Sequence, residues 1–117
     1  MSGNSQTTGS TKMWSVCVID MFSYQEPDGD FEITGFADEA TATEYARRRT
    51  RDSLESLRKE ATSDEDLRQR WFSFGEDCLV MGGSYKGLSE LAHFIKHPAT
   101  ESERNWAALT PSREVQS

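Results

Sequence analysis

The sequence predicts a small α+β domain with the element order β-β-α-α-β-α. We expect a three-stranded, mostly antiparallel sheet with helices packed largely on one face. Three observations support this prediction: two strand-like runs flank a Pro-Asp-Gly turn, a long amphipathic helical pattern follows them, and a third apolar run lies between two further helical patterns.

The first two strands are predicted to form a hairpin. Residues 13–24 are rich in β-branched and aromatic side chains, and both alternating faces are apolar, which is typical of a central strand. Residues 26–30 contain Pro and Gly at positions that favour a turn. Residues 31–36 then return as the second strand.

A long helix is predicted to begin after Asp38, whose carboxylate can accept hydrogen bonds from the free amides of the first turn. Its apolar residues recur at helical spacing as far as Leu57, while the opposite face is densely charged. A helix of ~20 residues is about 30 Å long, which is enough to cross a hairpin.

A second helix is predicted to begin with a capping box formed by Thr62 and Glu65. Residues 77–81 are expected to form the third strand, and a last helix is expected to end before Pro98. Gly75 joins the second helix to this strand, and we expect it to adopt a positive φ as a left-handed C-cap.

The neighbours of Gly75 complete this predicted joint. Phe74 is expected to pack inward and hold the turn. Glu76 and Asp77 are expected to face water or to cap nearby amides.

The 117-residue chain is expected to form one domain between two mostly disordered tails. Residues 1–12 and 99–117 are mostly polar and cannot bury enough apolar surface to offset the entropy of ordering them. The domain is therefore placed at residues 13–98. The side chains expected in its core are Val16, Val18, Ile33, Ala46, Leu54, Trp71, Val80 and Leu91.

Composition argues against several classes of partner and location. The net charge of −7 and the pI of about 4.8 predict repulsion from nucleic acids and anionic membranes. No apolar run approaches the ~20 residues of a membrane helix, and the N-terminus lacks a signal-peptide pattern. Cys17 and Cys78 lie in apolar runs, so we expect buried, reduced thiols in a cytoplasmic protein.

The basic run from Arg47 to Arg51 has two interpretations. Arginine side chains bind phosphate well, so Arg47, Arg48 and Arg51 could follow a nucleic-acid backbone. The alternative is a solvated helix face, because acidic residues are interleaved at spacings that favour ion pairs along the helix. The acidic net charge favours this second interpretation.

No catalytic, metal-binding or cofactor-binding signature is recognised. His93 and His97 have the spacing of a metal-binding pair but are expected to face water, opposite the apolar residues of their helix. Asp20 interrupts an apolar strand, so either the strand ends there or Asp20 pairs with an arginine such as Arg49 at a pocket. A small-molecule binder or an enzyme could use such a pocket, with Asp20, Arg49 and Tyr24.

Aromatic side chains near the strand ends exceed what a core of this size needs. An exposed aromatic residue beside acidic residues suits a protein-binding patch. The candidate partner-binding residues are Phe22, Tyr24, Phe72, Glu76, Asp77 and Tyr85.

Residues 14–95 resemble an uncharacterised family of short bacterial proteins. The resemblance lies in the steps Phe22-Ser23-Tyr24, Gly35-Phe36-Ala37-Asp38 and Phe74-Gly75-Glu76-Asp77. It implies a cytoplasmic bacterial protein and supplies no activity. Residues 14–55, with their Phe-x-Asp-Glu-Ala helix start, also resemble bacterial antitoxin domains of the partial RNase-H type.

The sequence therefore favours a small acidic, non-enzymatic binding or accessory module whose partner is another protein. The two alternatives are a nucleic-acid-associated regulator and a small-molecule binder or enzyme, at the residues named above. No cofactor is expected.

Overall fold

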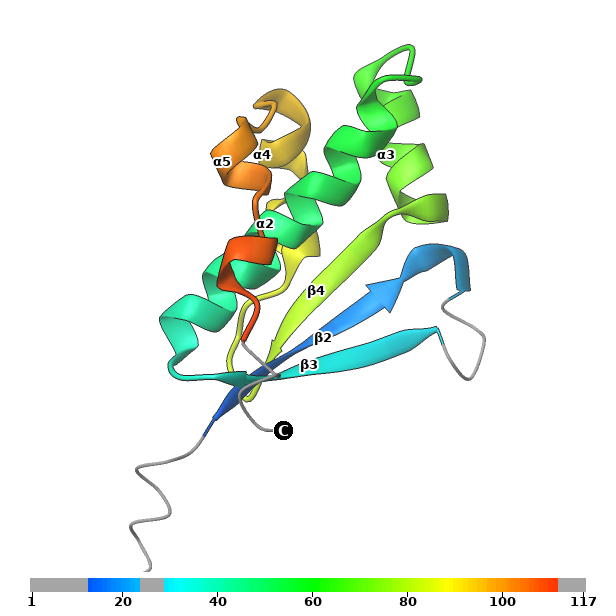
Figure 1. The fold of residues 1–117 in the computed structure, drawn as a ribbon. Coiled ribbons are helices and arrows are strands. Elements are labelled where there is room, and N and C mark those ends of the chain that lie inside the picture. The colour runs from blue at the N-terminus through cyan, green and yellow to red at the C-terminus, as the bar shows by residue number, and fades with distance from the viewer. Residues whose placement is uncertain (1–12, 24–28, 112–117) are drawn as a thin grey trace, which may run out of the picture.

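The computed structural model describes residues 13–23 and 29–111, and its centre is a three-stranded antiparallel sheet (Figure 1). The strands are β2 (Trp14–Asp20), β3 (Asp30–Phe36) and β4 (Glu76–Met81), in the spatial order β3-β2-β4. Four α-helices accompany them in the described part of the chain. The predicted α+β fold, with β2 in the centre, is confirmed.

The register of the sheet places its apolar side chains under the helices. Val16 lies opposite Ile33 on one side and Val80 on the other, and Val18 is paired with Cys78 on β4. Because side chains one residue apart point to opposite faces, these residues share one face. Val16, Val18 and Cys78 are fully buried there.

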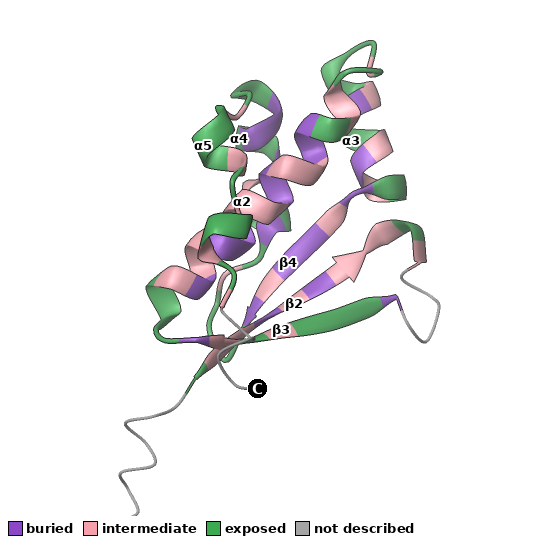
Figure 2. Cartoon of the chain, in the orientation of Figure 1, coloured by how far each residue is buried: buried purple, intermediate pink, exposed green. Residues whose placement is uncertain are grey.

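Helix α2 (Glu39–Arg58) covers this face of the sheet (Figure 2). It begins as predicted: the Asp38 carboxylate accepts a hydrogen bond of 2.7 Å from the Thr41 amide. Tyr45 and Ala46 of α2 pack with Val16 and Val18 in the first of two core clusters.

Helix α3 (Asp64–Phe74) and helix α4 (Leu91–Lys96) form the second core cluster with α2. The cap of α3 differs from the prediction: Ser63, not Thr62, accepts from the amide of Asp66, so the predicted capping box is wrong. The members of this cluster are Leu54, Leu67, Trp71, Leu91, Phe94 and Ile95. A short 3-10 helix, η2 (Gly87–Glu90), leads into α4.

The predicted left-handed conformation of Gly75 is wrong. Its φ is −83°, which any residue can adopt. Glycine is required here for space, because a Cβ would lie 2.6 Å from Nε1 of Trp71. Phe74 is also placed differently, since its side chain is 56% exposed instead of packed inward. The buried indole of Trp71 occupies the space that Phe74 was expected to fill.

The expected disorder of residues 99–117 is wrong for residues 99–111. Helix α5 (Glu101–Arg104) has a complete capping box, in which Thr100 and Glu103 satisfy each other's amides. The 3-10 helix η3 (Ala107–Leu109) follows, and Leu109 packs on the first core cluster. Residues 1–12 and 112–117 lie outside the described residues.

Seven of the eight predicted core residues are buried. The exception is Ile33, which is only partly buried because β3 forms an edge of the sheet. Within the described ranges, no helix is long and apolar enough to cross a membrane.

Candidate functional site: a groove beside helix α2

The charged face of α2 is largely covered by the chain that follows α4. Arg48 donates to the carbonyl of Asn105 at 3.1 Å, and Arg51 donates to the carbonyl of His97. Asp52 accepts from Arg104 Nε at 2.8 Å. The ion pairs expected along this face are present in part, since Arg48 Nε lies 2.9 Å from Glu44. The face also holds the C-terminal segment, which neither interpretation made from the sequence expected.

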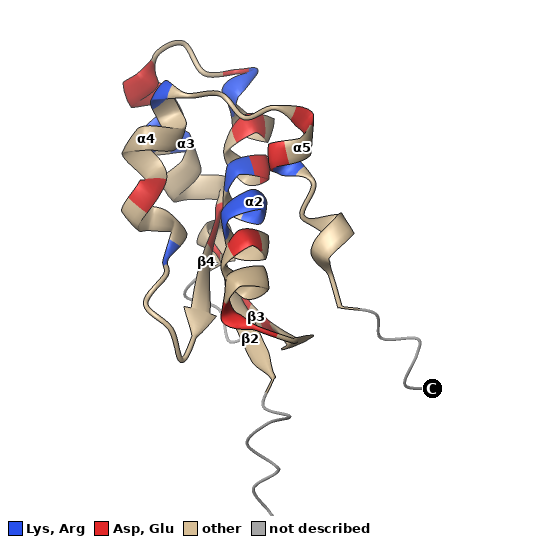
Figure 3. Ribbon diagram, turned by 90° about the vertical axis from the view of Figure 1, so that its left-hand side faces the viewer, with Lys and Arg blue, Asp and Glu red and all other residues tan. Residues whose placement is uncertain are grey.

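Arg47 is also engaged within the protein. Its Nε donates to Glu90 at 2.9 Å, and the Tyr85 hydroxyl donates to the same carboxylate at 2.7 Å. Burial and the neighbouring Glu90 raise the pKa of Tyr85. The alternation of charges along α2 is visible in Figure 3. The three arginines proposed for phosphate binding therefore all have acidic or carbonyl partners.

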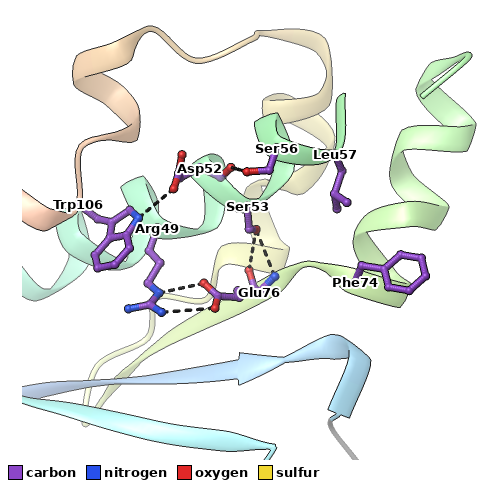
Figure 4. A pocket seen from close by; sticks show the side chains of 8 residues that line it. All are labelled: Arg49, Asp52, Ser53, Ser56, Leu57, Phe74, Glu76 and Trp106. Carbon is purple, nitrogen blue, oxygen red and sulfur yellow. Dashed lines mark hydrogen bonds and ion pairs between the residues drawn. The ribbon is translucent and has the colours of Figure 1, made fainter. Parts of the chain in front are cut away.

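A groove of about 340 Å³ lies beside α2, between the C-terminal segment and the junction of α3 with β4 (Figure 4). We call it the α2 groove. Its lining residues are Arg49, Asp52, Ser53, Ser56, Leu57, Phe74, Glu76 and Trp106. A larger hollow, of about 680 Å³, lies at α5 and is lined by the polar residues Glu101, Ser102, Arg104 and Asn105.

An ion pair between Arg49 and Glu76 lies at the centre of the α2 groove. Two guanidinium nitrogens donate to the two carboxylate oxygens, at 2.9 and 3.3 Å, and a third donates to the Tyr45 hydroxyl at 2.7 Å. Burial alone would lower the pKa of Arg49, but the hydrogen bond and charge of Glu76 outweigh it and raise the pKa. The arginine is therefore a fixed cation.

Arg49 has no ion pair with Asp20, so the pocket considered from the sequence is not built. Strand β2 ends at Asp20, and its carboxylate accepts from the amide of Phe22 at 3.0 Å. This bond holds the start of the 3-10 helix η1 (Met21–Ser23). The ion-pair partner of Arg49, for which the sequence suggested Asp20, is Glu76.

Ser53 fixes the wall of the groove that Glu76 occupies. Its hydroxyl donates to the carbonyl of Thr50 at 2.8 Å and accepts from Trp71 Nε1 and from the Glu76 amide, both at 3.1 Å. The hydroxyl therefore ties α2 to α3 and to the first residue of β4. Such a bonded network gives the groove a rigid wall.

One exposed phenylalanine, Phe74, lines the groove, and two others contact its lining residues. Phe22 and Phe74 are 72% and 56% exposed, and their rings stack with centroids 5.7 Å apart. Phe31 is 44% exposed, and its ring centroid lies 5.3 Å from Cζ of Arg49. Only Phe22 was among the predicted partner-binding residues. The position of Phe31 near the start of an edge strand, β3, is the signal that could have found it.

The other predicted partner-binding residues are separated. Phe72 is partly buried and its ring meets that of Trp71 edge-on. Asp77 is 8% exposed and accepts from the Leu88 amide at 2.9 Å. Tyr85 is bound to Glu90, away from the groove lining. Tyr24 lies outside the described residues. Of the six candidates, Glu76 lines the groove and Phe22 stacks on its lining residue Phe74.

Reactive groups are few in the described chain. Its residues include no group of three or more His, Cys, Asp or Glu placed to hold a metal ion. His93 and His97 are exposed, with rings stacked 4.1 Å apart. Burial raises the pKa of the Cys78 thiol to about 12, which keeps it protonated. What the groove offers is a fixed charged pair surrounded by aromatic rings.

Comparison with models of known protein families, with curated proteins and with solved structures finds no match. The resemblances noted from the sequence remain predictions.

Proposed function

We propose that the protein is a small acidic, non-enzymatic module that binds another protein through the α2 groove. The observation that carries this proposal is a groove that holds the fixed Arg49 and the exposed Phe74. The exposed Phe31 lies beside Arg49, and the exposed Phe22 stacks on Phe74. Aromatic residues and arginine are enriched at the energetic centres of protein interfaces. Their exposure in the free chain leaves apolar area for a partner to bury.

The arrangement is also suited to binding because it is held in place before any partner arrives. The groove walls are joined by the Ser53 hydrogen bonds and by the Arg49–Glu76 pair. A preorganised surface loses less conformational entropy on association, which favours affinity. The two free thiols agree with a site of action in the cytoplasm, which we include in the proposal.

The two alternatives weighed from the sequence gain no support from the geometry. Phosphate binding would need Arg47, Arg48 and Arg51 to leave their present partners. A small-molecule site built from Asp20 and Arg49 would need two side chains that bond elsewhere.

The proposal is tested by capture from the lysate of native host cells, followed by mass spectrometry, with and without nuclease. The baits are the wild-type protein, the groove variant Phe74→Ser and the control variant Leu88→Ser. Leu88 is also an exposed large apolar residue, at 41%, but does not line the groove. We expect the wild type and Leu88→Ser to capture the same partner regardless of nuclease, and Phe74→Ser to lose it. Capture that survives in Phe74→Ser, or that disappears with nuclease, would overturn the proposal.

A further inference from the structure

Strand β3 is an edge of the sheet formed by the described strands. On the far side of β4, Leu79 is bridged to Lys86, and the amide of Val80 donates to the carbonyl of Tyr85 at 3.1 Å. No strand in the described ranges pairs with the outer edge of β3. An open edge presents unpaired amides and carbonyls, to which another extended chain can add.

The side chains of β3 alternate between apolar and acidic along the regular part of this edge. Phe31 lies opposite Val18, so it shares the helix-covered side of the sheet with Ile33. Asp30 and Glu32 lie opposite Ile19 and Cys17, on the other side. Both acidic residues are exposed. The edge therefore has one apolar side and one negatively charged side.

The same alternation makes pairing with a second copy of this chain unfavourable. Residues opposite each other in an antiparallel pair lie on the same face of the sheet. Two copies of the regular stretch can therefore pair with Phe31 facing Phe31 or with Glu32 facing Glu32. The first arrangement sets Asp30 against Glu32, and the second sets Glu32 against itself. Opposed like charges destabilise a strand pair.

Antiparallel pairing of two copies with Ile33 facing Ile33 is unfavourable for a different reason. It would use Thr34 and Gly35, where the ladder with β2 is irregular and Gly35 has a φ of 99°. Such an irregularity turns an edge away from further pairing. A strand of different charge is therefore favoured at this edge over antiparallel pairing with a second copy.

We propose that the outer edge of β3 binds an extended segment of a partner protein in which Lys or Arg alternates with apolar residues. The cations of the partner would lie opposite Asp30 and Glu32. The net charge of −7 on this chain would also attract these cations over longer range. The apolar residues would lie beside Phe31 and Ile33, on the side of the sheet that bears the α2 groove. This inference rests on the proposed function and names the chemistry of the partner.

The test is a nuclear magnetic resonance titration of the isotope-labelled full chain with the capped peptide KVKVKV. Its controls are EVEVEV, which reverses the charge, and KKKVVV, which keeps the composition but loses the alternation. We expect KVKVKV to shift the amide signals of β3 and to slow their hydrogen exchange, and expect neither control to do so. Absence of these changes at β3 up to millimolar peptide would overturn the inference.

A charge reversal separates strand pairing from general attraction to an acidic protein. Glu32→Lys should weaken KVKVKV binding about fivefold or more and create binding to EVEVEV, because an attractive cross-strand pair becomes repulsive. Glu60→Lys is the matched control: it makes the same change of net charge at a side chain that is 80% exposed, just beyond the C-terminal end of α2. Equal effects of the two variants would contradict the inference.

The outcome is distinguishable from a failure of the proposed function. If partner capture depends on Phe74 but KVKVKV does not change the amide signals of β3, the groove proposal stands and the inference about the β3 edge is wrong. If capture does not depend on Phe74, the groove proposal falls whatever the peptide does.

Discussion

The indole ring of Trp106 lies over the guanidinium of Arg49, with 4.1 Å between Cζ and the ring centroid. The indole N–H donates at the same time to Asp52, one turn further along α2, at 3.0 Å. Trp106 thus anchors the C-terminal segment to the helix and forms one wall of the α2 groove. These two contacts add to the hydrogen bonds of Arg48 with Asn105 and of Arg104 with Asp52, which hold the same segment on α2.

Replacing Trp106 should release this segment. A cation–π contact and a hydrogen bond are lost together, so Trp106→Ala should lower the free energy of unfolding by about 1–3 kcal/mol, measured by urea denaturation. Trypsin cleavage after Arg104 should become faster at the same time. Trp106→Phe is the control, because it keeps a ring over Arg49 and loses only the N–H. Unchanged cleavage in Trp106→Ala would contradict the anchoring role.

Separating Arg49 from Glu76 should destabilise the protein without unfolding it. The pair is bidentate and partly buried, so Glu76→Gln should cost about 1–2 kcal/mol of unfolding free energy. Arg49→Lys should cost a similar amount, because an ammonium group cannot donate the two parallel hydrogen bonds that the guanidinium makes to the carboxylate. The measurement is a double-mutant cycle, in which the combined variant should cost clearly less than the two single costs added together. Simple additivity would show that the pair is not energetically coupled.

Residue 75 is a glycine because the Trp71 indole leaves no space for a Cβ. Gly75→Ala should lower the unfolding free energy by about 1–3 kcal/mol, since the new methyl group must displace the indole. If this contact is the cause, adding Trp71→Phe should relieve part of the cost, so the double variant should be less damaged than the sum of the singles. Full additivity, measured by chemical denaturation, would point to the backbone instead of the indole.

Asp77 should make stability depend on pH. Burial raises the pKa of its carboxyl above the ordinary value of 3.8, so the native state binds the proton more tightly than the unfolded state. The contribution of this group is therefore fully present below the unfolded pKa and is lost as the pH rises through the higher native pKa. Asp77→Asn keeps an oxygen for the Leu88 amide and removes the titration.

The unfolding free energy of Asp77→Asn relative to the wild type should accordingly rise between about pH 4 and pH 7. Asp77→Ala is the contrasting variant, because it leaves the Leu88 amide unpaired and should cost about 1–3 kcal/mol. A pH-independent difference between Asp77→Asn and the wild type, in urea titrations at the two pH values, would contradict this account.

Local patterns were sufficient to predict the three strands and the helices α2, α3 and α4. The alternation of Val16 and Val18, the cap at Asp38 and the helical spacing of Ala46 and Leu54 each depend on near neighbours in sequence. These features are set by hydrophobic periodicity and by capping chemistry, which a single sequence displays.

The candidate site depended on contacts that no local pattern shows. Arg49 meets Glu76 across 27 positions, and Trp106 meets Asp52 across 54. The C-terminal segment looked disordered because its composition is polar, yet the charged face of α2 supplies its partners. The error at Gly75 has the same origin, since the Trp71 indole that needs the space could not be placed from sequence.

The most direct test of the α2 groove as a binding site is site-specific photocrosslinking in native host cells. The photoreactive phenylalanine analogue benzoylphenylalanine replaces Phe74 in one strain and the exposed Leu88 in another. The account predicts a discrete protein adduct after irradiation from position 74 and none of that mass from position 88. No adduct from position 74, or the same adduct from both positions, would contradict it.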